Sequence, residues 1–197
     1  MRTLAKQLGF GVMSLYNHVQ DKDDLLDAMV DQAAAEIELP AADGDKKDWP
    51  RTLRYCAISA YKVMLRYRWL PLLWNRWPGQ HKNRYHEAIL RIMRQAGVPE
   101  ELACRGFHAV TMHVYGFALQ VVDMPGPRSE ELRGLGRNAL AELDQTTFPY
   151  LTEHIQFHLD GRDQRNDFKY MLDLIIDGLV RDLDTETGQT VDRAPPR

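Results

Sequence analysis

The sequence predicts an all-α fold, and three observations support this prediction. Apolar residues recur at the three- or four-residue spacing of a helix along most of the chain of 197 residues. No segment shows sustained alternation of apolar and polar residues, which is the pattern of a half-buried strand. Glycine and proline fall between the periodic segments, where they end helices. We therefore expect a helix-turn-helix head followed by an α-helical bundle.

The N-terminal segment predicts the helix-turn-helix unit. Residues 1–8 form a first short helix, residues 9–11 (GFG) a turn, and residues 12–19 a second short helix. In such a unit the second helix lies in the major groove of DNA. A connecting helix over residues 22–39 follows, with Leu25, Leu26, Met29, Ala33 and Ile37 on one face. Residues 40–47 (PAADGDKK) have the composition of a linker.

The rest of the chain predicts a larger helical body. A helix over residues 49–67 is followed by a Trp-rich stretch in which Pro71 and Pro78 allow a short helix at most. Further helices are predicted over residues 83–96, which Gly97 closes, and then over 100–122, 130–143, 148–159 and 164–183. The predicted domains are 1–39 (partial helix-turn-helix domain with its connecting helix), 48–184 (regulatory, ligand-binding and dimerisation domain) and 185–197 (disordered tail).

Composition narrows the functional classes. The hydrophobic content of 44% and charged content of 27% are those of an ordinary globular protein, and the net charge of −3 excludes a generally basic coat. Charge is nevertheless local, because residues 1–22 carry three cations and one anion, whereas residues 23–38 carry six acidic side chains and no cation. The longest apolar stretches, such as residues 69–74, are too short to span a bilayer. Cys56 and Cys104 are far apart in sequence. We expect a cytoplasmic protein with reduced thiols and no membrane partner.

The two short helices each have an inward and an outward face. Leu4, Ala5 and Leu8 are predicted to face inward on the first helix, as are Leu15 and Val19 on the second. The predicted DNA-binding residues are Arg2, Val12, Met13, Ser14, Tyr16, Asn17, His18 and Lys22. Asn17 can pair with adenine, apolar side chains can meet thymine methyls, and Arg2 can reach a guanine or a phosphate. Hydroxyl groups, His18 and Lys22 suit phosphate contacts. The alternative is a helical hairpin that only caps the bundle.

The run LAKQLGFGVMSLYNHVQDKDDLLDAM, residues 4–29, closely resembles the DNA-binding head of TetR-family transcriptional repressors. Less specific similarity extends to Tyr115–Gln120 and Leu172–Leu179 in the body. The resemblance implies a homodimer in which the last long helices pair, and in which an effector changes the spacing of the two heads. On the helix 164–183 it implies an interface made by Phe168, Met171, Leu172, Ile175, Ile176 and Leu179. The alternative is a helix buried within one subunit.

The family pattern includes a further helix before the helix that starts here at Met1. Without that helix, the inner faces around Leu4, Leu8 and Leu15 would be partly exposed, at a cost of roughly 1.5–3 kcal/mol for each side chain. We therefore expect that the head is N-terminally truncated and that the native start lies upstream. The alternative is a dimeric small-molecule-binding protein that has lost DNA binding through this truncation.

Large aromatic and methionine side chains concentrate between residues 61 and 117, which suits an adaptable apolar cavity. We expect an effector pocket between the helices 49–67, 83–96 and 100–122. Its predicted residues are Tyr61, Met64, Trp74, His86, Met93, Phe107, Thr111 and Tyr115. His86, Thr111 and Tyr115 would be its polar groups. The alternative is that these residues are simply core.

Catalytic motifs are missing from the sequence. It has no Gly-rich phosphate loop, no nucleophile-elbow serine and no Cys-x-x-Cys pair. His154 and His158 share a helical face, but no third metal ligand is fixed by spacing, and solvent-facing histidines are the preferred interpretation. We expect no enzyme activity, no metal and no cofactor. The predicted partners are palindromic operator DNA, a second copy of the chain, and an unknown small effector, apolar or aromatic, that releases the repressor from DNA.

Overall fold

The computed structural model describes residues 1–41, 48–76, 79–122, 130–161, 167–186 and 188. Within these residues the regular secondary structure is helical, which confirms the predicted all-α class. None of the helices in this part of the chain is long and apolar enough to cross a membrane. Most of the predicted linker 40–47 and most of the predicted C-terminal tail lie outside the described residues.

The head consists of α1 (Arg2–Leu8), α2 (Val12–Tyr16) and α3 (Lys22–Ala34). Asp21 caps α3 by accepting a hydrogen bond from the backbone N–H of Asp24 at 2.9 Å, and acidic side chains in the first turn favour the positive end of the helix. α3 ends at Ala34, five residues before the predicted boundary. The chain turns there because Ile37 is buried in the core, at 5% exposure, and the N–H of Glu38 donates to Ser59 of α4.

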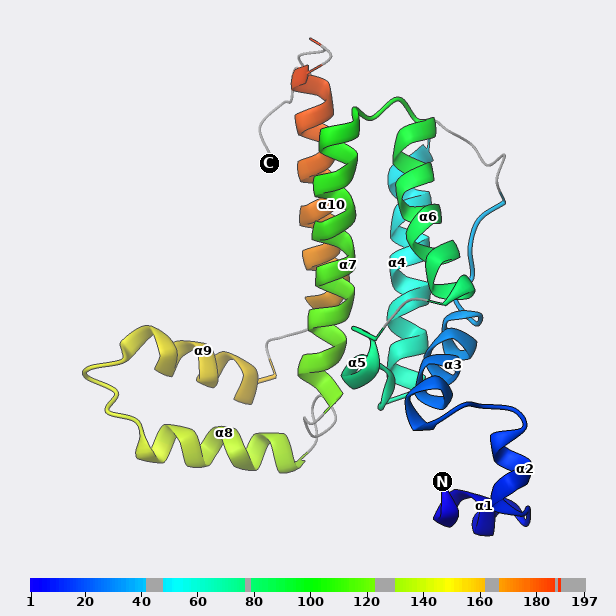
Figure 1. Ribbon diagram of the computed structural model, residues 1–197. Helices are drawn as coiled ribbons and strands as arrows, with labels where there is room; N and C mark the ends of the chain where they lie inside the picture. The colour runs from blue at the N-terminus through cyan, green and yellow to red at the C-terminus, as the bar shows by residue number, and fades with distance from the viewer. Residues whose placement is uncertain (42–47, 77–78, 123–129, 162–166, 187, 189–197) are drawn as a thin grey trace.

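Four long helices form the bundle of the body. They are α4 (Trp49–Arg66), α6 (Gln80–Gln95), α7 (Glu100–Val122) and α10 (Asp167–Glu186), with the short α5 (Leu70–Leu73) at their lower end. Figure 1 shows α7 and α10 side by side, α4 and α6 next to them, α3 against the lower part of this bundle, and α1 and α2 projecting below. Arg54 of α4 pairs with Asp173 of α10 at 2.6 Å. The core is formed by side chains from all four helices, including Leu53, Cys56, Met64, Tyr85, Ile89, Met93, Val110, Leu172 and Ile176.

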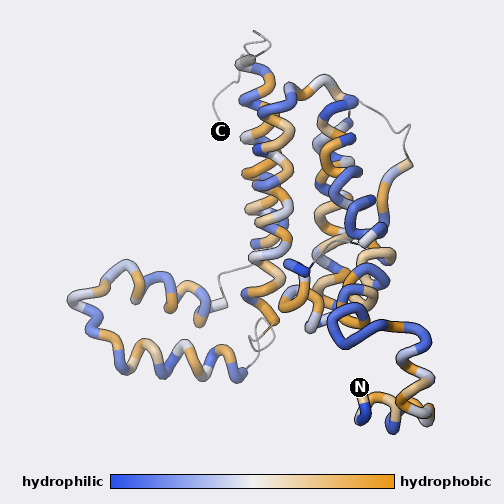
Figure 2. The backbone as a smooth tube through the Cα atoms, viewed as in Figure 1, coloured by the Kyte–Doolittle hydropathy of each residue, from blue (hydrophilic) through white to orange (hydrophobic). Residues whose placement is uncertain are grey.

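α8 (Glu130–Glu142) and α9 (Pro149–Leu159) form a helical hairpin, which we call the arm. The two helices pack on each other, and none of their described side chains is buried. In Figure 1 the arm extends sideways from the lower end of α7, away from the bundle. Figure 2 shows that apolar stretches remain on this extended arm.

The ends of α6 and α10 also differ from the prediction. α6 begins at Gln80, almost a turn before the predicted start at residue 83, and α10 continues to Glu186, beyond residue 183 and into the predicted tail. The other end of α6 is as predicted: Gly97 adopts φ of 88°, a conformation that favours glycine, and the N–H of Val98 returns to the carbonyl of Met93 at 3.1 Å.

Candidate nucleic-acid interface and effector site

A left-handed glycine makes the turn between α1 and α2. Gly9 has φ of 73°, which costs a residue with a Cβ but not glycine, and the N–H of Phe10 returns to the carbonyl of Ala5 at 3.0 Å. Gly11 is extended and precedes the first residue of α2. The local sequence therefore builds the predicted pair of short helices with a tight turn.

The predicted DNA-binding side chains lie close together in sequence, on α1, α2 and the segment that leads into α3. Met13 is 75% exposed and Tyr16 43% exposed. Asn17, His18, Arg2 and Lys22 are also exposed, whereas Val12 and Ser14 are half-buried. α2 ends at Tyr16 instead of residue 19, so Asn17 and His18 follow the last helical residue. The first turn of α2 therefore presents Met13, and the polar pair lies at its C-terminal end.

The inward face of α1 is only partly covered. Ala5 is buried at 1% exposure and Leu4 is half-buried, but Leu8 is 52% exposed. Partial exposure of Leu4 and Leu8 is what the sequence predicts for this face when no further helix packs on it. α1 packs mainly against the short α2.

The acidic run after the motif attaches the head to the body. Arg76, which follows α5, pairs with Asp27 at 2.5 Å and with Asp23 at 2.9 Å, both on α3. These carboxylates hold the pKa of the Arg76 guanidinium above its usual value, with the hydrogen bond to Asp27 the larger contribution. In the sequence Asp23 and Asp27 indicate only local negative charge, because their partner Arg76 lies about 50 positions away.

Asp31 of α3 binds the start of α6. Its Oδ1 accepts hydrogen bonds from the backbone N–H groups of His81 at 2.8 Å and Lys82 at 3.0 Å. The N-cap position of α6 is Gly79, which has no side chain, and a Cβ at that position would lie 2.3 Å from the Cγ of Asp31. This contact from α3 supports the early start of α6.

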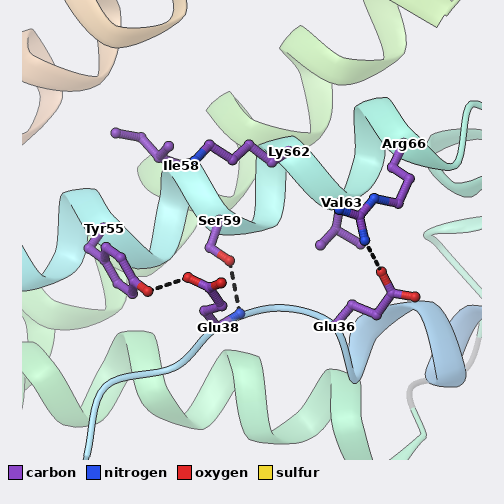
Figure 3. Close-up of a pocket in the computed structure, with 8 residues that line it drawn as sticks. All are labelled: Glu36, Glu38, Tyr55, Ile58, Ser59, Lys62, Val63 and Arg66. Atoms are coloured by element: carbon purple, nitrogen blue, oxygen red, sulfur yellow. Dashed lines mark hydrogen bonds and ion pairs between the residues drawn. The ribbon is translucent and has the colours of Figure 1, made fainter.

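The segment after α3 is tied to α4 around a polar notch of about 190 Å³. Glu36 pairs with Arg66 at 2.7 Å and accepts a hydrogen bond from Tyr67, which together lower the pKa of its carboxyl, the Tyr67 bond contributing most. The carboxylate of Glu38 accepts a hydrogen bond from Tyr55. Figure 3 shows the notch and its lining residues, Glu36, Glu38, Tyr55, Ile58, Ser59, Lys62, Val63 and Arg66. Together with the contacts of Arg76 and Asp31, these interactions fix the whole connecting segment to the body.

The predicted effector residues fall into two aromatic clusters. In the first, the His86 ring lies 6.3 Å from Trp74 and 5.3 Å from Phe107, edge-on to both. In the second, Tyr61 of α4 stacks on Phe168 of α10 at 3.9 Å and lies edge-on to Phe117 of α7 at 5.7 Å. Only the first cluster therefore brings predicted residues from the α5 region, α6 and α7 together.

The remaining predicted effector residues offer fewer free hydrogen-bonding groups than expected. Thr111 donates its hydroxyl proton to the carbonyl of Phe107 on its own helix, at 2.7 Å. Tyr115 accepts a hydrogen bond from Asn75 at 3.2 Å. Met64 and Met93 are buried in the core, at 1% and 0% exposure. Burial lowers the pKa of His86 to about 4, with the nearby Lys82 charge adding to the effect, so this imidazole is neutral at neutral pH.

Two buried polar residues beside the first cluster were not predicted. Lys82 is 5% exposed, and its ammonium donates to the carbonyls of Trp74 and Arg76 and lies 4.8 Å from the Trp74 ring centroid. Tyr85 is 1% exposed. The spacing of Lys82, Tyr85 and His86 could have indicated that they lie together, because residues three and four positions apart share one face of a helix.

α10 uses most of its predicted dimer stripe within its own subunit. Phe168, Leu172, Ile176 and Leu179 are 7% exposed or less and pack in the core against neighbouring helices, so they do not form an exposed interface. Ile175 is half-buried, while Met171 is 45% exposed and Leu174, which was not predicted, is 54% exposed. The apolar stripe was too broad to show which side faced the bundle.

Comparisons with known proteins agree with this arrangement. Residues 39–183 match the family model described as tetracyclin repressor-like, C-terminal domain. An HTH-type transcriptional repressor of Mycobacterium tuberculosis is 28% identical over 99% of this chain and 78% of its own length. Tetracycline repressor protein class D of Escherichia coli is 30% identical over 73% of this chain and 69% of its own length.

Solved structures give the same result. The Streptomyces coelicolor TetR family protein ActR in complex with actinorhodin superposes with a TM-score of 0.73 at 26% identity. The match covers 92% of this chain and 85% of that protein. Since the family model covers most of the chain and a repressor relative matches nearly all of it, the chain belongs to the TetR family of DNA-binding transcriptional regulators.

Proposed function

We propose that this regulator is a homodimeric repressor that binds a palindromic operator and is released by a small apolar or aromatic effector. The observation that carries the proposal is the exposed set of side chains around α2, held on a connecting helix whose acidic residues bind the body. The repressor names of the relatives support this role. The role is one of binding, without catalysis.

In this proposal the two heads enter successive major grooves, roughly 34–36 Å apart on one side of the duplex. Val12, Met13 and Asn17 read base edges, with Asn17 suited to adenine and the apolar pair to thymine methyls. Arg2, Ser14, Tyr16, His18 and Lys22 contact phosphates or, for Arg2, a guanine, and so position the head. The weakly basic N-terminal segment and the acidic connecting helix restrict DNA contact to this end of the molecule.

The effector acts on the head through α6. This helix carries His86 and Met93 of the proposed effector site, and its first turn is bound by Asp31 of α3. A ligand that shifts α6 therefore displaces α3 and the heads, provided that it binds the two conformations with different affinity. Couplings of this kind are commonly about 1–3 kcal/mol.

The dimer interface is proposed on the outer face of α10 and on the arm. Met171 and Leu174 expose apolar surface on α10, and Ile175 lies at its edge. The arm exposes further large apolar side chains, namely Leu135, Phe148, Tyr150, Leu151 and Phe157. Exposed apolar side chains that gather in a patch mark interaction sites. Phe168, Leu172, Ile176 and Leu179 support the interface from the core side.

The test is DNA binding by the purified chain, measured by fluorescence anisotropy on duplexes from its own promoter region at several salt concentrations. We expect binding that is tighter than to scrambled duplexes of the same composition. Asn17→Ala should reduce this preference, whereas Lys22→Ala should weaken binding to all duplexes and lower the salt slope by about 1. Lys62→Ala, which removes an exposed lysine of α4, is the matched control. Equal affinity for promoter and scrambled DNA would refute the proposal.

A further inference from the structure

Tyr85 carries a buried hydroxyl that has no hydrogen-bond partner among the described residues. Its side chain is 1% exposed, and burial raises the pKa of the phenol, with the nearby Cys56 adding to the effect. The hydroxyl therefore stays protonated and is a hydrogen-bond donor. A buried donor without an acceptor is destabilising, and such groups are uncommon in folded proteins.

The surroundings of Tyr85 are aromatic. Its ring centroid lies 6.2 Å from that of Trp74, in an edge-on arrangement, and 5.6 Å from that of His86. Phe107 of α7 packs edge-on against His86. Trp74 and His86 thus contact the ring of Tyr85, and Phe107 extends the same aromatic cluster through His86.

Two backbone acceptors of this region are already in use. Lys82 lies three residues before Tyr85 on α6, and its ammonium donates hydrogen bonds to the carbonyls of Trp74 and Arg76. The Lys82 ammonium is thus already bonded to these carbonyls, and burying a further charge that has no partner is costly. An acceptor from outside the chain would therefore complete the site best if it were uncharged.

The hydrophobic core to which Tyr85 belongs contains adaptable side chains. Met64 of α4 and Met93 of α6 belong to the same buried cluster, together with the small residues Ala57, Ala60 and Ala103. Methionine side chains change shape at low cost, so such a core can rearrange around a planar guest.

We propose that Tyr85 is the anchor of the effector site, donating its hydrogen bond to an uncharged carbonyl oxygen of a planar aromatic effector that packs against Trp74 and Phe107. This inference rests on the proposed effector function and names the ligand class and the residue that selects it. Wrong ligands are those that leave the hydroxyl unpaired or bring a charge into the site.

The test compares matched probes on the full chain by isothermal titration calorimetry. 2-Acetylnaphthalene offers a carbonyl acceptor, 2-ethylnaphthalene has nearly the same shape without one, and 2-naphthoate carries a charge. We expect the wild-type chain to bind the ketone about tenfold more tightly than the hydrocarbon, which is the effect of one net hydrogen bond. Tyr85→Phe should abolish this preference by weakening ketone binding about tenfold while leaving hydrocarbon binding unchanged.

Stability and a second tyrosine provide the controls. Tyr85→Phe removes only the unpartnered hydroxyl, so the Tm of the ligand-free variant should equal or exceed that of the wild type. Tyr55→Phe alters an exposed tyrosine bonded to Glu38 and should leave the ketone preference intact. Equal binding of ketone and hydrocarbon, binding of neither, a preference that survives Tyr85→Phe, or tighter binding of 2-naphthoate would each overturn the inference. Loss of specific DNA binding alone would refute repression and leave this preference unaffected.

Discussion

At the scale of single residues, one oxygen atom of Asp31 both caps the start of α6 and joins that helix to α3. Its Oδ1 accepts from two N–H groups in the first turn of α6, which Gly79 cannot satisfy with a side chain of its own. The same bonds join the helix that leaves the head to a helix of the body. Loss of this carboxylate therefore affects a helix terminus and the head–body junction together.

Asp31→Ala should lower the free energy of unfolding by about 1 kcal/mol, within the range of 0.5–2 kcal/mol found for lost helix caps. Urea denaturation followed by circular dichroism measures this difference. Asp31→Asn keeps an acceptor oxygen at the same place and should retain most of the stability. A loss for the asparagine variant as large as for the alanine variant would show that charge, not the acceptor, is what α6 requires.

Gly79→Ala should destabilise the chain by about 1–3 kcal/mol, because the new Cβ overlaps the side chain of Asp31, whose Oδ1 accepts two hydrogen bonds from α6. The φ of Gly79 is −81°, so the backbone conformation itself tolerates alanine. In the double variant Asp31→Ala/Gly79→Ala the overlap is gone. A double-mutant cycle should therefore show non-additivity of about 1 kcal/mol or more, and strictly additive losses would contradict the geometry.

His86 makes stability depend on pH. Its folded pKa of about 4 lies below the unfolded value of about 6.5, so the unfolded chain binds the extra proton first as the pH falls. Stability should decrease between pH 6.5 and pH 4, by about 1–2 kcal/mol after allowing for partial solvent screening. Denaturant titrations at pH 7 and pH 5 measure this loss, which His86→Gln should reduce. An NMR titration placing the His86 pKa near 6.5 would contradict the prediction.

At the scale of elements, α10 divides its apolar residues between two directions. Leu172 and Ile176 face the bundle with almost no exposure, whereas Leu174 lies between them in sequence and points outward. The alternation follows from a 100° turn per residue, and it explains how one helix can complete a core and offer a second surface.

Leu174→Glu should shift the chain from dimer to monomer, because it places a charge in the proposed interface without disturbing the bundle. Analytical ultracentrifugation at micromolar concentration measures the change, and circular dichroism checks that the fold is kept. Leu65→Glu, at a 44% exposed apolar site of α4, is the matched control and should leave the oligomeric state unchanged. A dimer that persists in Leu174→Glu would place the interface elsewhere.

Helix existence could be predicted from the sequence more reliably than helix ends. The periodicity of α7 gave its bounds, Glu100–Val122, without error. The early start of α6 could not be found, because its N-terminal N–H groups bind Asp31, 50 positions away. α2 was predicted three residues too long, since the pattern through Val19 continues while the backbone leaves the helix after Tyr16.

At the scale of the whole molecule, ionic and hydrogen-bonding contacts join the head to the body along the entire connecting segment. Arg76 pairs with the first part of α3, and the first turn of α6 donates hydrogen bonds to Asp31, farther along α3. α4 pairs with Glu36, which follows the end of α3. Head and body should therefore respond as one unit to a change in either of them.

Arg76→Gln should loosen the beginning of α3 while leaving the bundle intact. Hydrogen exchange followed by mass spectrometry should show several-fold faster exchange in residues 22–34 and unchanged protection in α7 and α10. Arg105→Gln removes an exposed pair with Glu101 on α7 and is the matched control. Uniformly faster exchange throughout the chain would indicate general destabilisation, and unchanged exchange in α3 would show that Arg76 does not hold it.

The sequence predicts the candidate DNA-binding residues better than the candidate effector residues. The predicted DNA-binding residues of the head follow from local spacing, and most of them are exposed. The predicted effector residues depend on which aromatic rings meet across helices, and the stacking of Tyr61 on Phe168, about 100 positions away, could not be read from local spacing. Tyr85 resembles any other core tyrosine in sequence, and only its missing partner distinguishes it.

The close approach of Asp31 to Gly79 also limits the order in which this protein can change during evolution. A lineage that acquires a side chain at position 79 while Asp31 is present passes through a clashing intermediate. The same change becomes tolerable once position 31 has been shortened and the start of α6 has gained another cap. Positions 31 and 79 should therefore covary among related regulators, with a carboxylate at the first found together with glycine at the second.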